Sequence, residues 1–329
     1  MGSPPIALDK TQLSFPWSVH KYPGKVRDVY DLGDHILMVA TDRISACDHI
    51  LPKPIPCKGQ ILNSIAREFL LESRALVPNW LHQNLDIDPA VSFGKKAEPI
   101  RIEMVIRGYC VGHAWREYQL GQRSLCGVPM PEGMKEGDAF PQAIITPSTK
   151  AVEGHDEDIS KAEILWRGIV SESTYHQLEQ YTRKLFEWGQ KKARERGLIL
   201  ADTKYEFGWD DQGEIILIDE IHTPDSSRYF YLEDYDRLRA QGKRPRQLSK
   251  EFVREWLIKE GFQGKGGQEM PAMTEEVVDA ITDRYKELYE TLMGKPFTAA
   301  ADIVSPHERI QNAVNEQLIP FLSDRRSDT

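Results

Sequence analysis

Strand patterns and helix patterns follow one another along this 329-residue chain without regular alternation. Short apolar and β-branched runs at 26–31 and 35–41, joined by Leu32-Gly33-Asp34, predict a hairpin near the N-terminus. Helical spacing of apolar residues predicts helices over four ranges, 61–73, 160–196, 250–260 and 275–293. This order favours an α+β fold over a doubly wound sheet. The absence of a GxGxxG run also disfavours a Rossmann dinucleotide enzyme.

Composition and charge argue against several classes of protein. No apolar run approaches the roughly 20 residues of a membrane helix, and residues 1–10 lack the basic and apolar regions of a signal peptide. The net charge of −9 disfavours general affinity for nucleic acid or anionic membranes. The four cysteines show no CxxC spacing, which favours free thiols in a reducing compartment. We therefore expect a cytoplasmic globular enzyme, with no nucleic acid and no membrane among its partners.

The segment from Leu200 to Glu220 carries the most informative group of polar side chains. Two apolar strand patterns flank Asp210-Asp-Gln-Gly213, so we expect a hairpin with a four-residue loop. In that register Phe207 opposes Ile216, Tyr205 opposes Ile218, and Lys204 opposes Asp219. Because side chains alternate, one face would be apolar and the other would carry four polar residues, Asp202, Lys204, Glu206 and Asp219. Glu206 and Asp219 would then be diagonal neighbours about 7–8 Å apart.

Two converging carboxylates beside a lysine suit Mg²⁺. This ion takes one or two protein carboxylates and completes its coordination with water and phosphate oxygens. The alternative is a solvated outer face on which Lys204 and Asp219 form a weak cross-strand ion pair. The hairpin alone favours this second interpretation, whereas the polar segments elsewhere in the chain favour the metal site.

Several of those segments place cations, hydroxyls and glycines at strand ends or in loops. Lys25 and Arg27 alternate onto one face of a predicted strand, where they could grip a polyphosphate, although edge strands ordinarily carry such residues. Arg107 ends a strand predicted over 99–107 and precedes two nearby glycines, so its guanidinium could bind a carboxylate or phosphate. Hydroxyls and charges also punctuate three further runs, 40–48, 146–156 and 223–228. The proline- and glycine-rich stretch 121–154 is expected to be a long functional or disordered loop.

Taken in order, these segments closely resemble SAICAR synthetase, the phosphoribosylaminoimidazole-succinocarboxamide synthase family of purine biosynthesis. The matching runs are GKVRDVY (24–30), ATDRISA-D (40–48), RGY--G--W (107–115), TPSTKA with GHD (146–156), LADTKYEFG (200–208) and IDE-HTPDSSR-F (218–230). The likeness continues from GFQGKGGQEMPAM to RYKELYE (261–289). Many short motifs in the right order are far more specific than any one of them.

The resemblance implies a ligase that uses ATP and Mg²⁺ to join L-aspartate to the carboxylate of CAIR, 5-amino-1-(5-phospho-D-ribosyl)imidazole-4-carboxylate. The products would be SAICAR, ADP and phosphate. The implied fold is of the SAICAR-synthase type, related to ATP-grasp enzymes, with nucleotide in a cleft between a small β-rich domain and a larger α+β domain. We expect a β-rich nucleotide-binding part over 1–108, a central α+β part over 109–245, and a helical part over 246–329 packed on the central one. The protein would be a monomer or homodimer.

Carried over position by position, the resemblance also implies roles for individual residues. Nucleotide binding is implied for Gly24, Lys25, Arg27, Glu103 and Lys204. Metal binding is implied for Glu206 and Asp219, and catalysis for Lys150, Asp156 and Asp219. Contact with the substrates is implied for Ser45, Arg107, His113, Ser227 and Arg228.

Two positions depart from the family pattern. His113 stands where a small serine is usual, at a position expected to contact the CAIR phosphate, and Cys47 stands where an aromatic residue is usual. Three alternatives therefore stay open: a ligase that activates another carboxylate, a catalytically silent nucleotide-binding or scaffold protein, and a small-molecule kinase. A silent relative should have lost at least one key charged residue, yet four of them are present, Lys25, Glu206, Asp219 and Arg228.

Overall fold

The computed structural model describes residues 6–46, 49–150, 157–264, 266–300 and 304–327. Its contacts group the chain into two compact units, each with its own sheet. Unit 1 comprises Met1–Leu71, Trp80–Lys96 and Lys250–Thr329, and unit 2 comprises Glu72–Asn79 and Ala97–Ser249. The mixture of strands and helices agrees with the predicted α+β class. The grouping differs from the three expected ranges, because residues 250–329 belong with the N-terminal residues.

Unit 1 is built on a four-stranded antiparallel sheet. Its strands follow the order β1 (His20–Pro23), β2 (Arg27–Asp31), β3 (His35–Ala40) and β6 (Val91–Lys95). The predicted hairpin is confirmed as β2 and β3, and Gly33 makes its turn with a φ of 95°. Strands β4 (Ser45–Ala46) and β5 (His49–Ile50) form a separate small ladder.

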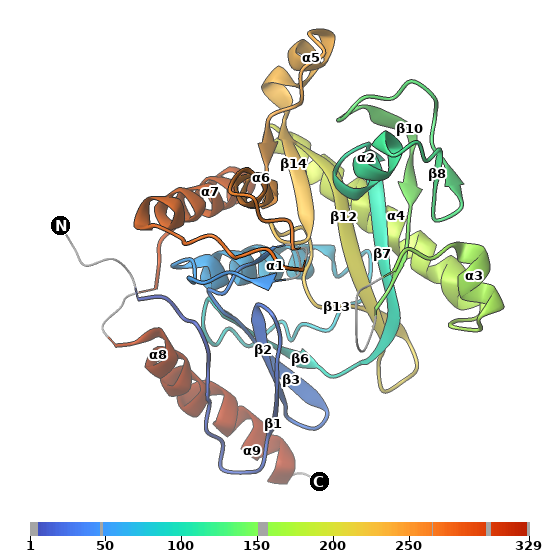
Figure 1. Cartoon of the computed structure of the whole chain (residues 1–329). Coiled ribbons are helices and arrows are strands. Elements are labelled where there is room, and N and C mark those ends of the chain that lie inside the picture. The colour runs from blue at the N-terminus through green and yellow to red at the C-terminus, as the bar shows by residue number, and fades with distance from the viewer. Residues whose placement is uncertain (1–5, 47–48, 151–156, 265, 301–303, 328–329) are drawn as a thin grey trace. The chain divides into compact units, whose positions relative to one another are not determined.

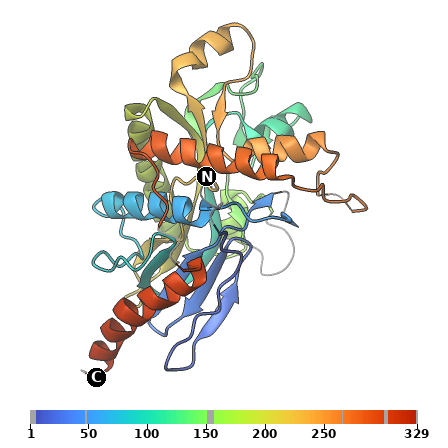
Figure 2. The ribbon, with the colours of Figure 1, turned by 90° about the vertical axis from the view of Figure 1, so that its left-hand side faces the viewer.

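The C-terminal helices cover one face of this sheet (Figures 1 and 2). A nearly continuous helix runs through α8 (Pro306–Ala313), the π-helical segment η1 (Val314–Leu318) and α9 (Ile319–Ser327). Its buried residues Ile310, Val314 and Leu318 pack with Leu37 and Phe93 of the sheet. Because this apolar stripe needs the N-terminal sheet to cover it, the C-terminal residues fold with unit 1.

Three further helices complete unit 1. They are α1 (Lys58–Ser73), α6 (Glu251–Lys259) and α7 (Glu275–Met293). The predicted start of α7 is confirmed, since the Thr274 hydroxyl accepts a hydrogen bond from the Val277 amide. The fully buried Lys58 of α1 places its ammonium 5.5 Å from the centre of the Tyr285 ring of α7. None of the helices in the described ranges combines the length and the apolar character of a membrane span.

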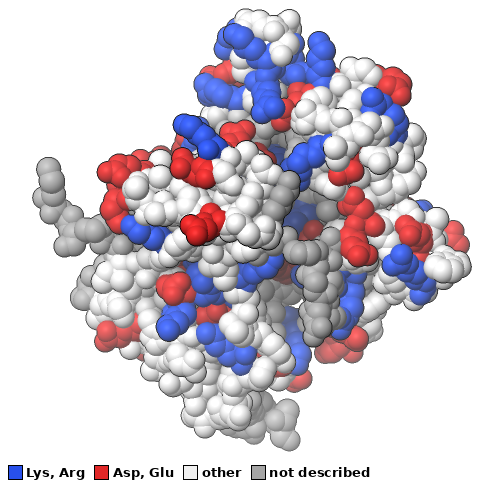
Figure 3. All heavy atoms as spheres, in the orientation of Figure 1, with Lys and Arg blue, Asp and Glu red and all other residues white. Residues whose placement is uncertain are grey.

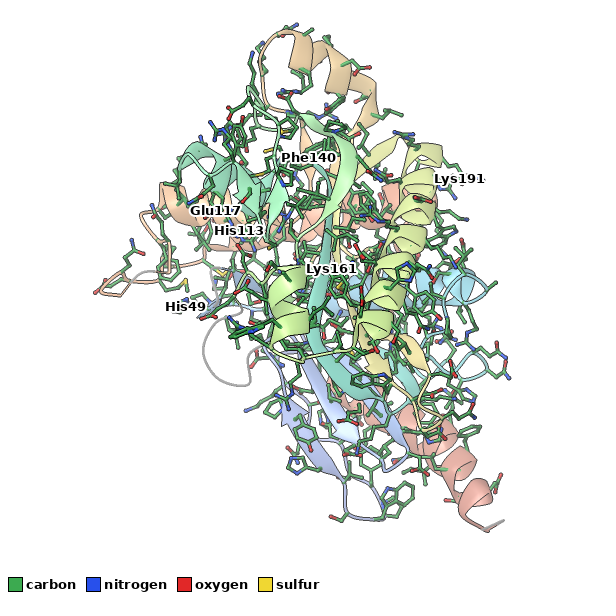
Figure 4. All side chains as sticks on the ribbon, turned by 90° about the vertical axis from the view of Figure 1, so that its right-hand side faces the viewer. His49, His113, Glu117, Phe140, Lys161 and Lys191 are labelled. Atoms are coloured by element: carbon green, nitrogen blue, oxygen red, sulfur yellow. The ribbon has the colours of Figure 1, made fainter. Side chains whose placement is uncertain are left out.

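Unit 2 is built on a seven-stranded antiparallel sheet. Its main path is β10 (Ala139–Ile145), β7 (Glu98–Tyr109), β12 (Leu198–Trp209), β14 (Ser227–Tyr231) and β15 (Gln247–Leu248). Strand β11 (Ser148–Thr149) pairs with β7, and β13 (Ile215–Ile218) pairs with β12. The long helix α4 (Glu172–Glu195) packs on β7 and β12, as Figures 1 and 4 show.

Two expectations for the middle of the chain need correction. The single helix expected over 160–196 is divided into α3 (Lys161–Trp166) and α4, because Gly168 takes a φ of 65° and Ser171 caps a new helix. The stretch 121–154 is not one long loop within its described part. It contains β10 and β11 and a small hairpin of β8 (Ser124–Leu125) and β9 (Val128–Pro129), so it contributes strands to unit 2.

The predicted hairpin at 200–220 forms, but its register is shifted by one residue. Glu206 pairs with Ile218 and Phe207 with Leu217. Gly213 takes a φ of 78° and donates to the Asp210 carbonyl, while the Asp210 amide donates to Glu214, so the loop has five residues, Asp210–Glu214. The prediction that Ile216 and Ile218 lie on the apolar face is therefore wrong, because both lie on the face that carries Glu206. Asp219 follows the end of β13 instead of pairing with Lys204.

Lys and Arg side chains gather around α5 (Leu232–Ala240), near the top of Figure 3. Several of them have carboxylate partners: Arg239 pairs with Asp138, Arg244 lies 2.5 Å from Glu136, and Arg246 lies 3.1 Å from Glu233. The positive charge of these arginines is therefore balanced locally, and the cluster is a poor candidate for an anion site.

Candidate active site

Two arginines converge on one buried carboxylate in the middle of the unit 2 sheet. Arg107 of β7 and Arg228 of β14 each donate a hydrogen bond to Asp202 Oδ2 of β12, at 3.1 and 2.8 Å. Asp202 is cross-strand partner to both arginines, so the strand order β7-β12-β14 brings the three side chains together. Two guanidinium groups against one carboxylate leave a net positive charge, which suits an anionic ligand.

Arg107 is nearly inaccessible to solvent, with 6% of its surface exposed. Burial lowers the pKa of Arg107, and the neighbouring Asp202 raises it. The side chain also donates from Nε to the Thr146 hydroxyl at 2.9 Å, so both edges of the guanidinium are held. The resemblance indicates Arg107 and Arg228, but it does not include Asp202 or Thr146 among the site residues. The sequence does carry one signal for Asp202, which is its place on the predicted polar face of the hairpin.

His113 lies at the start of α2 (Gly112–Gln119), beside this arginine cluster. Its Nε2 lies 2.6 Å from Asp158 Oδ2, and its Nδ1 lies 4.0 Å from Glu117, one turn along the helix (Figure 4). The hydrogen bond from His113 is the main cause that lowers the pKa of Asp158. The unusual histidine is therefore paired with an acid that no pattern in the sequence indicates.

The run Thr223 to Ser227 holds its hydroxyl groups in an internal network. Ser227 lies 2.8 Å from the Thr203 hydroxyl across the β12–β14 ladder, and Thr223 donates to Glu220 at 2.6 Å. Ser227 is 4% exposed. This network ties the segment that follows β13 to the sheet, next to Arg228.

A cluster of lysines and carboxylates begins two residues along β12 from Asp202, where Lys204 and Glu206 lie on the same face of the strand as Asp202. Glu206 and Glu103 are cross-strand partners on β12 and β7. Lys204 donates to Glu103 at 2.5 Å, and Lys150 forms a short ion pair with Glu206. Burial lowers the pKa of Lys204, but three neighbouring carboxylates, Glu103, Glu206 and Asp219, raise it further than burial lowers it. Lys204 is therefore a firmly charged ammonium among three acids.

The donor set of this cluster fits Mg²⁺ in its chemistry. Among the described residues, no group of three or more His, Cys, Asp or Glu side chains is placed to hold a metal. Mg²⁺, however, needs only one or two protein carboxylates, with phosphates and water as its other ligands. Glu206 and Asp219 both raise the pKa of Lys204. Their carboxylates therefore share one region of negative potential, in which the ammonium groups of Lys150 and Lys204 lie. A dication would be stabilised by the same oxygens.

The remaining predicted residues belong to unit 1, apart from Asp156, which lies outside the described residues. The loop that carries Gly24 and Lys25 is fixed by Arg43, which donates to their carbonyl groups at 2.9 and 3.1 Å. Arg43 also lies 2.9 Å from Asp28 of β2. A Cβ on Gly24 would come within 2.8 Å of the Arg27 carbonyl, so the turn requires glycine. Arg43 therefore has a structural role in the run 40–48, where Ser45 is half-buried in β4.

Comparisons with known proteins agree on one family. The sequence model described as SAICAR synthetase matches residues 20–271. A phosphoribosylaminoimidazole-succinocarboxamide synthase of Cytophaga hutchinsonii is 55% identical over 305 residues, which cover 92% of this chain and 97% of that protein. The synthase of Flavobacterium psychrophilum is 55% identical over 313 residues, covering 94% and 98%. The solved structure of SAICAR synthase from Saccharomyces cerevisiae, complexed with SAICAR, has a TM-score of 0.74 at 34% identity and covers 89% of this chain and 100% of that one.

Proposed function

The chain belongs to the SAICAR synthetase family, a family of purine-biosynthesis ligases, and on that basis we propose that it joins L-aspartate to the carboxylate of CAIR at the expense of ATP. The observation that carries the assignment of the site lies in unit 2. Arg107 and Arg228 stand beside Asp202 on one face of β7, β12 and β14, and the lysine–carboxylate cluster follows on that face at Lys204 and Glu206, two and four residues along β12. Two to four strand residues span about 7–13 Å. An anionic group of the substrate can thus be held apart from the carboxylate that reacts.

A free carboxylate is a poor acyl donor, so it must first be activated. We propose that a carboxylate oxygen of CAIR attacks the γ-phosphorus of ATP, breaking the bond to ADP and forming an acyl phosphate. The amine of aspartate then attacks the acyl carbon, and phosphate leaves with one of the original carboxylate oxygens. The amine loses a proton, and the product is the amide SAICAR.

The residues of unit 2 support these steps by charge and position. Lys150 and Lys204 place ammonium groups where negative charge accumulates on the transferred phosphoryl group. Arg107 and Arg228 orient the anionic substrate, and His113 lies beside them. Asp156 is a candidate to order Lys150 or to accept the amine proton. In unit 1, Lys25 and Arg27 are our candidates for contact with the nucleotide phosphates.

Glu206 and Asp219 are the residues that would hold Mg²⁺. When bound, the ion neutralises charge on the phosphate oxygens and helps to orient the nucleotide. In this structure the ammonium groups of Lys150 and Lys204 compensate the negative charge of Glu206 and Glu103. If Glu206 and Asp219 held the ion, Lys150 and Lys204 would be available to pair with the nucleotide phosphates.

The direct test measures ADP release from the purified protein with ATP, Mg²⁺ and CAIR, with and without L-aspartate, while product absorbance is followed. ADP release that requires both CAIR and aspartate would support the proposed ligation. ADP formed with CAIR alone would indicate a kinase or an uncoupled activation. Tight ATP binding without turnover would favour the silent relative and direct attention to His113.

A further inference from the structure

The segment that follows β13 has an unusual backbone. Asp219 and His222 both take left-handed conformations, with φ values of 62° and 55°. Residues other than glycine adopt such conformations only where their surroundings fix them, and they cluster at functional sites. The segment 219–222 contains one proposed Mg²⁺ ligand, so whatever fixes its backbone also fixes that carboxylate.

The side chain of His222 is anchored from two elements of unit 2. Its Nε2 lies 2.6 Å from the hydroxyl of Tyr205 on β12, and 1% of the residue is exposed. On the other side lies α4, where the Trp188 ring stacks on the imidazole at a centroid distance of 5.8 Å. A Cβ on Gly189 would stand 2.3 Å from His222 Cε1, so the ring occupies space that only a glycine leaves open.

The backbone of His222 is held as well. The hydroxyl of Tyr229 on β14 donates to the His222 carbonyl at 2.7 Å. The neighbouring Ile221 is fully buried, and Thr223 donates to Glu220 at 2.6 Å. Every residue from 220 to 223 therefore has a buried side chain, which leaves the segment little freedom to move.

The strand β12 connects this anchor to the proposed metal site. Tyr205 stands between Lys204 and Glu206, and its side chain points to the opposite face of the strand. One face of β12 thus carries a proposed Mg²⁺ ligand, and the other face carries the hydroxyl that holds His222. The contact between Tyr205 and His222 fixes residue 222 relative to residue 206.

We propose that His222, which Gly189, Tyr205 and Tyr229 clamp, is a positioning residue that sets the backbone of 219–222. The backbone in turn directs the Asp219 carboxylate toward the metal–nucleotide complex. The inference deepens the proposed function and rests on the role given there to Asp219. His222 acts through shape and hydrogen bonding rather than charge, because its imidazole is buried and neutral. Partners that orient a metal ligand commonly contribute about 10- to 100-fold to metal affinity.

Tyr205→Phe tests the clamp, because it removes one hydroxyl and keeps the ring. The first measurement is Mn²⁺ binding to the full-length enzyme with a non-hydrolysable ATP analogue, followed by the paramagnetic resonance of free Mn²⁺. The second is hydrogen exchange of the amides at 219–223 without ligand. We expect Tyr205→Phe to raise the Mn²⁺ dissociation constant about tenfold or more and to speed this exchange.

The matched control is Tyr175→Phe in α4. Tyr175 is 2% exposed, and its hydroxyl makes no hydrogen bond within the described part of the chain. This variant should change neither quantity. Wild-type Mn²⁺ affinity in Tyr205→Phe would overturn the proposal, even if exchange at 219–223 became faster. Equal losses in both variants would do the same. If Tyr205→Phe does not fold, Tyr229→Phe carries the same expectations.

Different results are expected if the proposed function, and not the clamp, is wrong. A wild-type enzyme that binds the Mn²⁺–nucleotide but makes no SAICAR would refute the proposed substrates, and the two tyrosine variants would still test the clamp. A wild-type enzyme that binds no Mn²⁺ with nucleotide would overturn the clamp proposal together with the metal assignment.

Discussion

Arg228 occupies the space that a side chain on Gly112 would need. A Cβ on Gly112 would stand 2.4 Å from the guanidinium carbon of Arg228, closer than any real contact allows. Gly112 opens α2 with a φ of 56°, so the helix start and the arginine interlock. The position of Arg228 over Asp202 therefore depends on a missing side chain one element away.

Gly112→Ala should displace Arg228 and weaken the proposed substrate contact. We expect kcat/KM for CAIR to fall about 100-fold, since displacements near 1 Å at a positioning group have effects of that size. Steady-state kinetics with varied CAIR would show it. Gly121→Ala is the matched control, because Gly121 also has a positive φ, 93°, but open space around it. Equal kinetics for the two variants would contradict the predicted role of the contact.

Asp202→Asn should destabilise the fold strongly. Arg107 and Arg228 would lose their shared carboxylate, and Arg107 is buried. Removing one partner of a buried ion pair typically costs about 3–5 kcal/mol of unfolding free energy. Urea denaturation would measure the loss. Glu233→Gln, which breaks an exposed pair with Arg246, should cost less than about 1 kcal/mol. A loss of that small size in Asp202→Asn would show that the arginines do not depend on this carboxylate.

The free energy of unfolding should fall as the pH becomes acidic, partly because of His222. Burial lowers the pKa of His222 from 6.5 to about 3, so the unfolded chain binds the proton more tightly. This contribution is present above about pH 6.5 and is lost as the pH falls toward about 3. Between about pH 7 and pH 5 it should remove about 2 kcal/mol of unfolding free energy. Urea denaturation of wild type and His222→Gln at both pH values tests this. The variant should lack that loss, and parallel profiles would contradict the prediction.

Asp219→Asn should reduce turnover at least about 100-fold while the fold stays intact, because we assign Asp219 an electrostatic role in metal binding. Asparagine tolerates the left-handed backbone at this position. Initial rates at saturating ATP, CAIR and aspartate, with thermal unfolding as a check, would measure the effect. Asp211→Asn, in the exposed hairpin turn, should remain active. A wild-type kcat in Asp219→Asn would refute the metal assignment.

Local patterns predicted several elements correctly, because their causes are local. The β2–β3 hairpin follows from two β-branched runs and Gly33, and α7 follows from its apolar spacing. Short motifs in the right order indicate the family, and the comparisons confirm it. Such signals need no knowledge of the tertiary contacts.

The structure departs from the sequence pattern where one residue or a distant partner decides the local conformation. The left-handed Gly213 adds a residue to the loop of the β12–β13 hairpin, which exchanges the two faces of β13. Gly168 divides a continuous helical pattern. The role of Asp202 emerges only when β7 and β14 flank β12, and the His113–Asp158 pair joins residues 45 positions apart. Spacing along the chain does not encode these pairings.

The most direct measurement of the central claim, that ATP activates the CAIR carboxylate for attack by aspartate, follows an oxygen atom. The enzyme would be supplied with CAIR labelled with ¹⁸O in its carboxylate, together with ATP, Mg²⁺ and L-aspartate, and the released phosphate would be analysed by mass spectrometry. The account predicts that each phosphate carries one labelled oxygen and that SAICAR retains the other in its amide. Unlabelled phosphate, or label released without SAICAR, would contradict it.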